Sequence, residues 1–273
     1  MAGAAEDFIP EAAMNGRILS VVGGMFLLTV CSKGDQGNAA AAPAAPPAPA
    51  APATSDPSAD GGTITGKIKF TGTAAKNPTI DMSEEAACKA KYPSPPTEEV
   101  VVAGAANALA NVFVYVSAGL PANAKYQAPS TAVVLDQNGC RYHPHVLGIM
   151  VGQNLEIKNS DPLLHNIKAI AKKNRGFNVS QPNAGMTRDV TFSAPEVMVN
   201  LECNVHGWMH AYAGVRPDPF FAVSGADGSF SIKGLPPGTY TVEAWHERFG
   251  TQTATVTIAG TESKTANFTF AAH

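Results

Sequence analysis

Short stretches in which apolar and polar residues alternate recur along this chain, and such alternation is typical of half-buried β-strands. The alternation is clear in residues 64–70, and further apolar runs of the β type follow at 112–116, 131–135 and 146–150. Only residues 83–91 predict a short helical turn within this part of the chain. Turns rich in Gly, Asn and Pro separate the runs. The pattern therefore predicts an all-β protein.

The strand that ends at Cys203 carries the most informative chemistry. Apolar residues alternate through 197–203, so we expect the Cys203 thiol to point into the core. His206 and Met209 follow at intervals of three residues on the next loop. A thiol, an imidazole and a thioether suit a soft metal ion, and a blue-copper site adds a second imidazole. His165, which follows another predicted strand, is the candidate for that ligand.

His165-Asn166, followed some forty residues later by Cys203, His206 and Met209, resembles the cupredoxins, with a short ligand loop most similar to that of amicyanin. The resemblance implies a Greek-key β-sandwich that binds one type 1 copper ion. It implies His165, Cys203, His206 and Met209 as the four ligands. It also implies that the backbone N–H of Asn166 reaches the Cys203 sulfur and tunes the metal.

A second resemblance begins after the ligand loop. Residues 220–242, with an Asp-Gly hairpin and a Leu-Pro-Pro-Gly-Thr-Tyr turn, resemble the carboxypeptidase regulatory-like, prealbumin-type β-sandwich. That family opens with strands like those at 62–70 and 110–116, so the copper domain is expected to be inserted in, or followed by, this second, smaller sandwich. The predicted division is an export signal at 1–31, a tether at 32–62, first strands of the smaller sandwich at 63–126, the copper domain at 127–217 and the remaining sandwich at 218–273.

The beginning of the chain predicts export. Residues 18–30 form an apolar run that is too short to span a bilayer but has the length of a signal peptide's hydrophobic region. The acidic residues before it suit a signal poorly, so Met14 is the expected start. The run ends at Cys31 in a sequence that resembles a bacterial lipobox, which favours lipidation over plain cleavage. The Ala- and Pro-rich residues 32–62 then predict a disordered tether.

The other cysteines and histidines leave alternatives open. Cys88 and Cys140 form a plausible disulfide in an oxidising compartment, unless one of them stays a buried thiol. Alternation places His143 and His145 on the same side of a predicted extended segment, where we expect them either to bind a second metal ion or simply to pack. His210 competes with Met209 as a copper ligand. Zinc is a rival metal, but a structural zinc site needs a second close pair of ligands, which the sequence lacks.

These patterns predict an exported blue copper protein that carries single electrons in the bacterial periplasm or cell envelope, bound to the membrane through its lipid and serving a redox protein partner. We expect His206 to lie near the surface as the electron port. The alternative is a non-redox copper carrier or an envelope binding or structural module. We predict no enzyme activity, because we find no complete ligand set for a second, catalytic copper. The net charge of −3, without a cluster of Lys or Arg, predicts no binding of nucleic acid.

Overall fold

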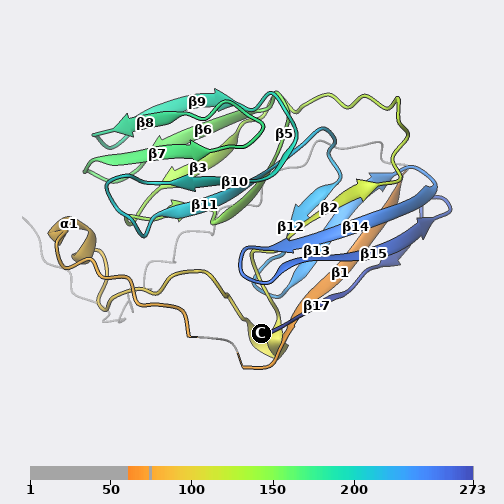
Figure 1. Cartoon of the computed structure of the whole chain (residues 1–273), viewed down its shortest axis with the longest axis horizontal. Helices are drawn as coiled ribbons and strands as arrows, with labels where there is room; N and C mark the ends of the chain where they lie inside the picture. Colours follow the sequence, from red (N-terminus) through yellow and green to blue (C-terminus); the bar gives the residue numbers. More distant parts are fainter. Residues whose placement is uncertain (1–60, 74–75, 273) are drawn as a thin grey trace, which may run out of the picture. The chain divides into compact units, whose positions relative to one another are not determined.

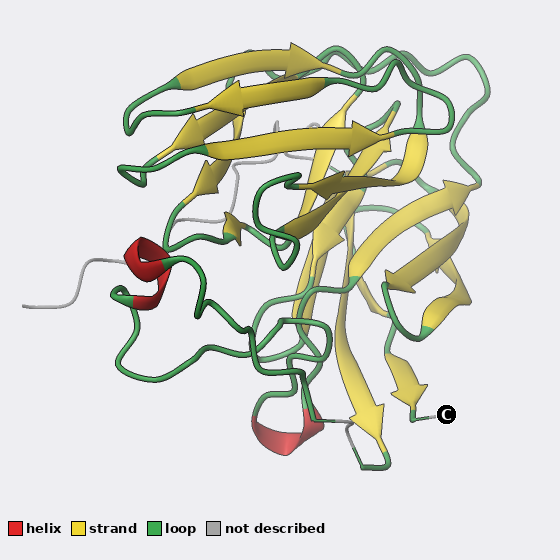
Figure 2. Ribbon diagram, turned by 60° about the vertical axis from the view of Figure 1, so that its left-hand side comes forward, coloured by secondary structure: helices red, strands yellow, loops and turns green. Residues whose placement is uncertain are grey.

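The computed structural model describes residues 61–73 and 76–272, and regular structure in this part of the chain is nearly all strand (Figures 1 and 2). The strands form four sheets. Two sheets enclose one hydrophobic core and two enclose another, so the protein is all-β with two sandwiches, as the alternating pattern predicted. The described residues all lie within one of the two units into which the chain divides, Pro49–His273.

The first sandwich contains the predicted copper domain. One of its sheets has the order β4-β3-β6-β9 and the other has the order β5-β11-β10-β7-β8. The strands of the first sheet are β4 (Tyr142–His143), β3 (Val133–Gln137), β6 (Asn154–Asn159) and β9 (Thr187–Thr191). Those of the second are β5 (Val146–Met150), β11 (His210–Arg216), β10 (Glu196–Glu202), β7 (His165–Ile170) and β8 (Asn178–Gln181). The central position of β10, between β11 and β7, brings Cys203 close to His165.

The second sandwich takes strands from both sides of the first. One sheet contains β13 (Ser229–Leu235), β1 (Gly62–Thr71), β16 (Ser263–Thr265) and β17 (Phe268–Ala271). The other has the order β12-β2-β14-β15, with β12 (Phe221–Val223), β2 (Phe113–Ala118), β14 (Gly238–His246) and β15 (Gly250–Ile258). Because β1 and β2 pair with strands that follow the first sandwich in the sequence, the first sandwich is inserted in the smaller one.

The segment between β1 and β2 contains a four-residue helix, α1 (Ala86–Lys89), and a 3-10 turn at Ala105–Asn107. Ile80, Met82 and Cys88 in this segment are buried in the core of the first sandwich. The sequence pattern assigned all of 63–126 to the smaller sandwich, so this assignment needs correction around α1. The reason is a disulfide from Cys88 to a loop of the first sandwich, at Cys140, which alternation cannot predict.

Strand β10 departs from the expected alternation at its beginning. The pairing of β10 with β11 shifts between Glu196 and Val199, which leaves Val197 36% exposed and turns Glu196 inward. The buried Glu196 carboxylate accepts hydrogen bonds from the backbone N–H groups of Lys172, Lys173 and Asn174, at 2.6, 2.9 and 3.0 Å. These bonds compensate the cost of burying its charge. Alternation resumes from Val199 onward, so the inward orientation of Cys203 is unaffected.

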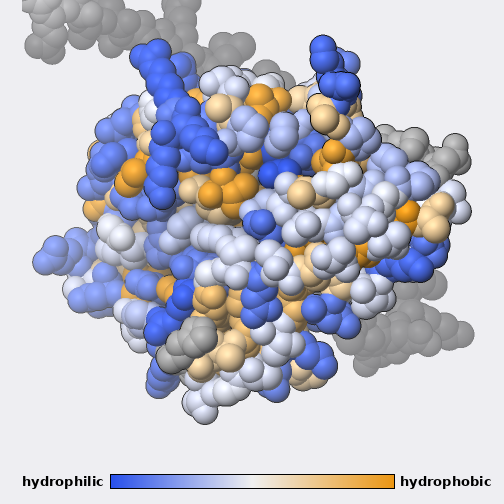
Figure 3. Space-filling view, turned by 45° about the vertical axis from the view of Figure 1, so that its right-hand side comes forward, coloured by the Kyte–Doolittle hydropathy of each residue, from blue (hydrophilic) through white to orange (hydrophobic). Residues whose placement is uncertain are grey.

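On the face shown in Figure 3, hydrophobic residues reach the surface in small groups between polar ones. Among the described residues, none of the helices has the length and hydrophobicity needed to cross a membrane. The expected signal at 1–31, with Met14 and the lipidation site Cys31, lies outside the described residues, as does nearly all of the tether at 32–62.

Candidate metal centre

The loop from Cys203 to Met209 joins β10 to β11 and folds back on itself. The backbone N–H of Cys203 donates to the carbonyl of Met209 at 3.1 Å, and the N–H of Met209 donates to the carbonyl of His206 at 2.9 Å. All three side chains are buried in the first sandwich. The loop therefore gathers the thiol, the imidazole and the thioether at one end of β10.

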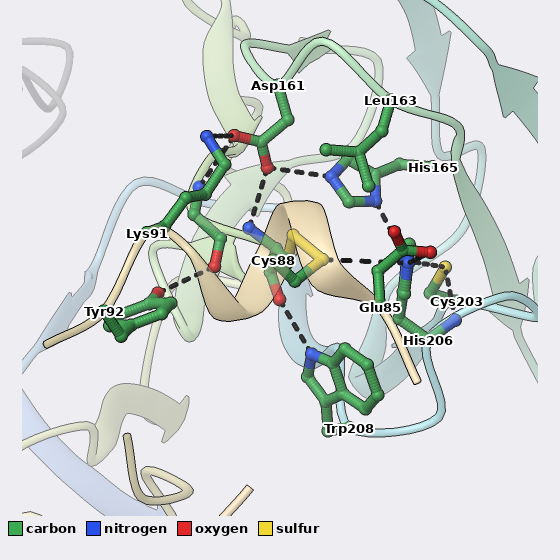
Figure 4. The surroundings of a disulfide bond; sticks show 12 residues. Glu85, Cys88, Lys91, Tyr92, Asp161, Leu163, His165, Cys203, His206 and Trp208 are labelled. Carbon is green, nitrogen blue, oxygen red and sulfur yellow. Dashed lines mark hydrogen bonds and ion pairs between the residues drawn. A yellow bond between two sulfur atoms is a disulfide. The ribbon is translucent and has the colours of Figure 1, made fainter. Parts of the chain in front are cut away.

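The second imidazole comes from the neighbouring strand. His165 is the first residue of β7, and its Nδ1 lies 3.1 Å from Nδ1 of His206, which in turn lies 3.9 Å from Sγ of Cys203. The ligand atoms of these three residues all lie within 4.8 Å of one another. Figure 4 shows the two rings and the sulfur directed at one another. Two imidazole nitrogens and a sulfur in this arrangement fit a copper ion.

The charge of the Cys203 sulfur also fits a metal ligand. Burial raises the pKa of the thiol, but hydrogen bonds from His165, from His206 and from the N–H groups of Val205 and His206 outweigh burial and lower the pKa to about 5. Both backbone N–H groups lie 3.4 Å from the sulfur. The sulfur is therefore a thiolate at neutral pH, which is the form that binds metals.

Asp161 is a functional residue that the sequence reasoning missed. Its fully buried carboxylate accepts from Nε2 of His165 at 2.8 Å, from Nζ of Lys91 at 2.7 Å and from the backbone N–H groups of Gly139 and Cys140 at 3.0 and 2.7 Å. Burial raises the pKa of Asp161, but these four donors outweigh burial and hold the pKa well below its ordinary value. The carboxylate thus fixes the His165 ring with Nδ1 facing the other ligands. Its position four residues before His165, just before Pro162, was the available signal.

The segment around α1 covers His206. Sγ of Cys88 lies 3.9 Å from Nε2 of His206, and a carboxylate oxygen of Glu85 lies 3.8 Å from the same atom (Figure 4). Nε1 of Trp208 donates to the carbonyl of Cys140 at 2.9 Å, with its ring 5.1 Å from that of His206. As a result His206 is only 2% exposed, and the expectation of a surface electron port at this residue is wrong.

Asn166 lies beside the centre but contributes differently from the expectation. Among the described residues, the backbone donors to the Cys203 sulfur are Val205 and His206, and Asn166 is not among them. The Asn166 side chain instead accepts from the backbone N–H of Asn204 at 3.1 Å and donates to the carbonyl of Val179 at 3.0 Å. Asn166 therefore holds the start of the ligand loop against β8.

The remaining candidate residues have distinct positions. The structure joins Cys88 to Cys140 by a disulfide and leaves Cys203 as the free cysteine of the described chain. His210, the rival ligand, opens β11, and its ring lies near His145, 5.1 Å between ring centroids. His143 belongs to none of the groups of potential ligands found among the described residues. The predicted pair of His143 and His145 is therefore not brought together around one point.

Comparison with known proteins gives similarities that each cover only part of the chain. Residues 215–271 match the family model of the carboxypeptidase regulatory-like domain. A Cu-containing nitrite reductase from Thermus scotoductus SA-01 is 22% identical over 37% of this chain and 26% of its own length, with a TM-score of 0.31. The chain thus spans about a quarter of that enzyme.

Two smaller proteins are similar over almost their whole length. A purple cupredoxin from Nitrosopumilus maritimus is 22% identical over 30% of this chain and 97% of its own, with a TM-score of 0.26. An oxidized amicyanin mutant is 18% identical over 38% of this chain and 98% of its own, with a TM-score of 0.29. No curated protein matches the sequence. The family model thus matches one of the two families that the sequence motifs indicated, the carboxypeptidase regulatory-like domain.

Proposed function

We propose that this chain is a type 1 copper protein that carries single electrons in the bacterial cell envelope. The observation that carries the proposal is the convergence of two imidazole Nδ1 atoms and a thiolate, from His165, His206 and Cys203, within 4.8 Å in a buried site. Met209 is buried at the end of the same loop and is the proposed weak axial ligand. A bound copper ion would supply a one-electron couple between Cu(I) and Cu(II).

The surroundings support rapid electron transfer because they hold the ligands in place before and after a change of charge. Asp161 orients the ring of His165, and the Cys203 sulfur accepts hydrogen bonds from two backbone N–H groups. Backbone hydrogen bonds close the ligand loop. A rigid site needs little rearrangement when an electron arrives or leaves. The burial of His165, Cys203 and His206 also argues against the alternative of a copper carrier, because a carrier has to release its ion to a partner.

The partner is proposed to be another redox protein of the envelope. Leu164 and Val205 each precede a ligand histidine, and they are 43% and 47% exposed. Exposed apolar residues this close in sequence to the ligands provide a short route between the site and a docked protein. The disulfide between Cys88 and Cys140 supports an oxidising location such as the periplasm. We propose no catalytic role for the centre itself.

The visible spectrum tests the proposal. One equivalent of Cu(II) added to the metal-free chain is expected to give an intense thiolate-to-copper absorption that Cys203→Ser abolishes and that the control His143→Ala retains. Met209→Leu is expected to keep the colour and raise the reduction potential, because losing the axial donor favours Cu(I). A lost or strongly altered spectrum in His210→Ala would sink the assignment of Met209. A coloured protein without a reversible one-electron couple would favour the copper carrier.

A further inference from the structure

A second group of metal-binding side chains lies outside the first centre. His145 follows β4, His210 opens β11, and Glu247 follows β14 in the smaller sandwich. Nε2 of His145 contacts Oε1 of Glu247, and Nε2 of His210 lies 4.0 Å from Oε2 of the same carboxylate. One ligand atom from each residue lies within 4.8 Å of the other two. Three segments far apart in the sequence thus meet at one point.

The first centre uses none of these three residues. His210 follows Met209 directly, but its ring lies beside those of His145 and Tyr212, at centroid distances of 5.1 and 6.2 Å. The Glu247 side chain is only 7% exposed, so its charge needs compensation, which His145 and a hydrogen bond with the Tyr212 side chain supply only in part. Among the described residues, the His210 ring nitrogens have no hydrogen-bond partner, although its side chain is only 21% exposed. A carboxylate oxygen of Glu247 and a ring nitrogen of His210 are therefore in place to bind a cation.

We propose that His145, His210 and Glu247 bind a divalent transition-metal ion, for which Zn²⁺ is the best match. Two imidazoles and one carboxylate are a common ligand set for zinc, and they leave a position open for water or a further group. A cleft of about 10 Å³ adjoins His145 and His210, which line it together with Glu98 and Arg141, and it has room for about one water molecule. The ion would also link the inserted sandwich to the smaller one, since Glu247 belongs to the latter.

Zinc binding by the full, metal-free chain tests this inference, with equilibrium dialysis against Zn²⁺ followed by metal analysis. His210→Ala and Glu247→Gln are each expected to remove one equivalent of zinc, or to weaken its binding at least about 100-fold, since even indirect contacts to a ligand change affinity by 10- to 100-fold. His143→Ala, a neighbouring histidine outside the group, is the matched control and is expected to keep that equivalent. Unchanged zinc binding in both His210→Ala and Glu247→Gln would overturn the inference.

The same measurement in a Cys203→Ser background separates this site from the first centre. Cys203→Ser is expected to retain the equivalent of zinc that the additional change His210→Ala removes. A chain that fails to give the copper colour but shows this His210-dependent zinc would contradict the proposed function and not the second site. If the variants fail to fold, crystals of the unaltered chain grown with Zn²⁺ decide: an anomalous-scattering peak between the two Nε2 atoms and the Glu247 carboxylate supports the site, and its absence overturns it.

Discussion

Replacing Asp161 with Asn removes a buried charge and turns one of its two acceptor oxygens into an amide donor. All four partners of Asp161 are donors: Lys91 and the Gly139 N–H at Oδ1, and His165 and the Cys140 N–H at Oδ2. Whichever way the new amide points, its NH2 group therefore faces two hydrogen-bond donors. In the less costly orientation the NH2 group replaces Oδ1, so Lys91 loses its hydrogen bond and turns to water, and the N–H of Gly139 is left without an acceptor.

The cost can be worked out from these contacts. An unsatisfied buried N–H costs about 1–3 kcal/mol, and the two bonds that remain lose their charge-assisted part, about 1 kcal/mol each. We therefore expect Asp161→Asn to lower the free energy of unfolding by about 4 kcal/mol at pH 7. For a folded chain of this size that corresponds to a fall in Tm of about 8–16 °C.

The pH dependence gives the sign of the effect. Because the folded-state pKa of Asp161 lies below its ordinary value, the carboxylate stabilises the fold fully above about pH 4, and this stabilisation is lost as the pH falls further. Urea unfolding of both proteins is expected to show a constant difference between pH 7 and 5 and a shrinking difference below pH 4. The copper form of the variant is expected to have a higher reduction potential, because a neutral partner makes His165 a less basic ligand.

Asp136→Asn is the matched control for this experiment. Asp136 lies on β3 and accepts one hydrogen bond from the hydroxyl of Ser160 at 2.7 Å, so its replacement is expected to cost less than about 1 kcal/mol. A loss of stability in Asp161→Asn no larger than in Asp136→Asn would refute the reasoning. So would a difference that persists undiminished below pH 4.

Two further predictions concern access to the centre. Replacing both Cys88 and Cys140 with Ala is expected to lower the free energy of unfolding by about 4 kcal/mol, from the entropy of the 52-residue loop, and to speed removal of copper by a chelator, because the cover over His206 is released. Urea unfolding and the rate of colour loss measure these effects, and an unchanged removal rate would show that the segment around α1 does not control access. The double change Leu164→Lys and Val205→Lys is expected to slow electron self-exchange at low salt with an unaltered spectrum, because like charges then meet at the exposed residues beside the ligands. Val134→Lys, on β3 and equally exposed, is the control, and equal slowing in both proteins would contradict a docking role.

Local pattern was sufficient for much of this protein. Alternation of apolar and polar residues identified the strands around Cys203, because the period of two in a strand is a property of the backbone. The spacing of Cys203, His206 and Met209 predicted a candidate ligand loop, since residues that are close in sequence on a short loop must also be close in space. The motifs of the smaller sandwich likewise predicted that strands on both sides of the insertion belong together, and the pairing of β1 and β2 agrees.

Contacts between distant segments required the tertiary structure. The four donors around Asp161 come from three separate parts of the chain, so no spacing marks this carboxylate as a partner of His165. The cover over His206 depends on α1, which lies more than a hundred residues earlier, and its presence reversed the expectation of a surface electron port. The grouping of His145 with His210 and Glu247, in place of His143, depends on how the ends of β4 and β14 lie beside the beginning of β11. Sequence pattern reports which face of a strand a residue occupies, whereas the packing of whole strands decides which side chain lies opposite it.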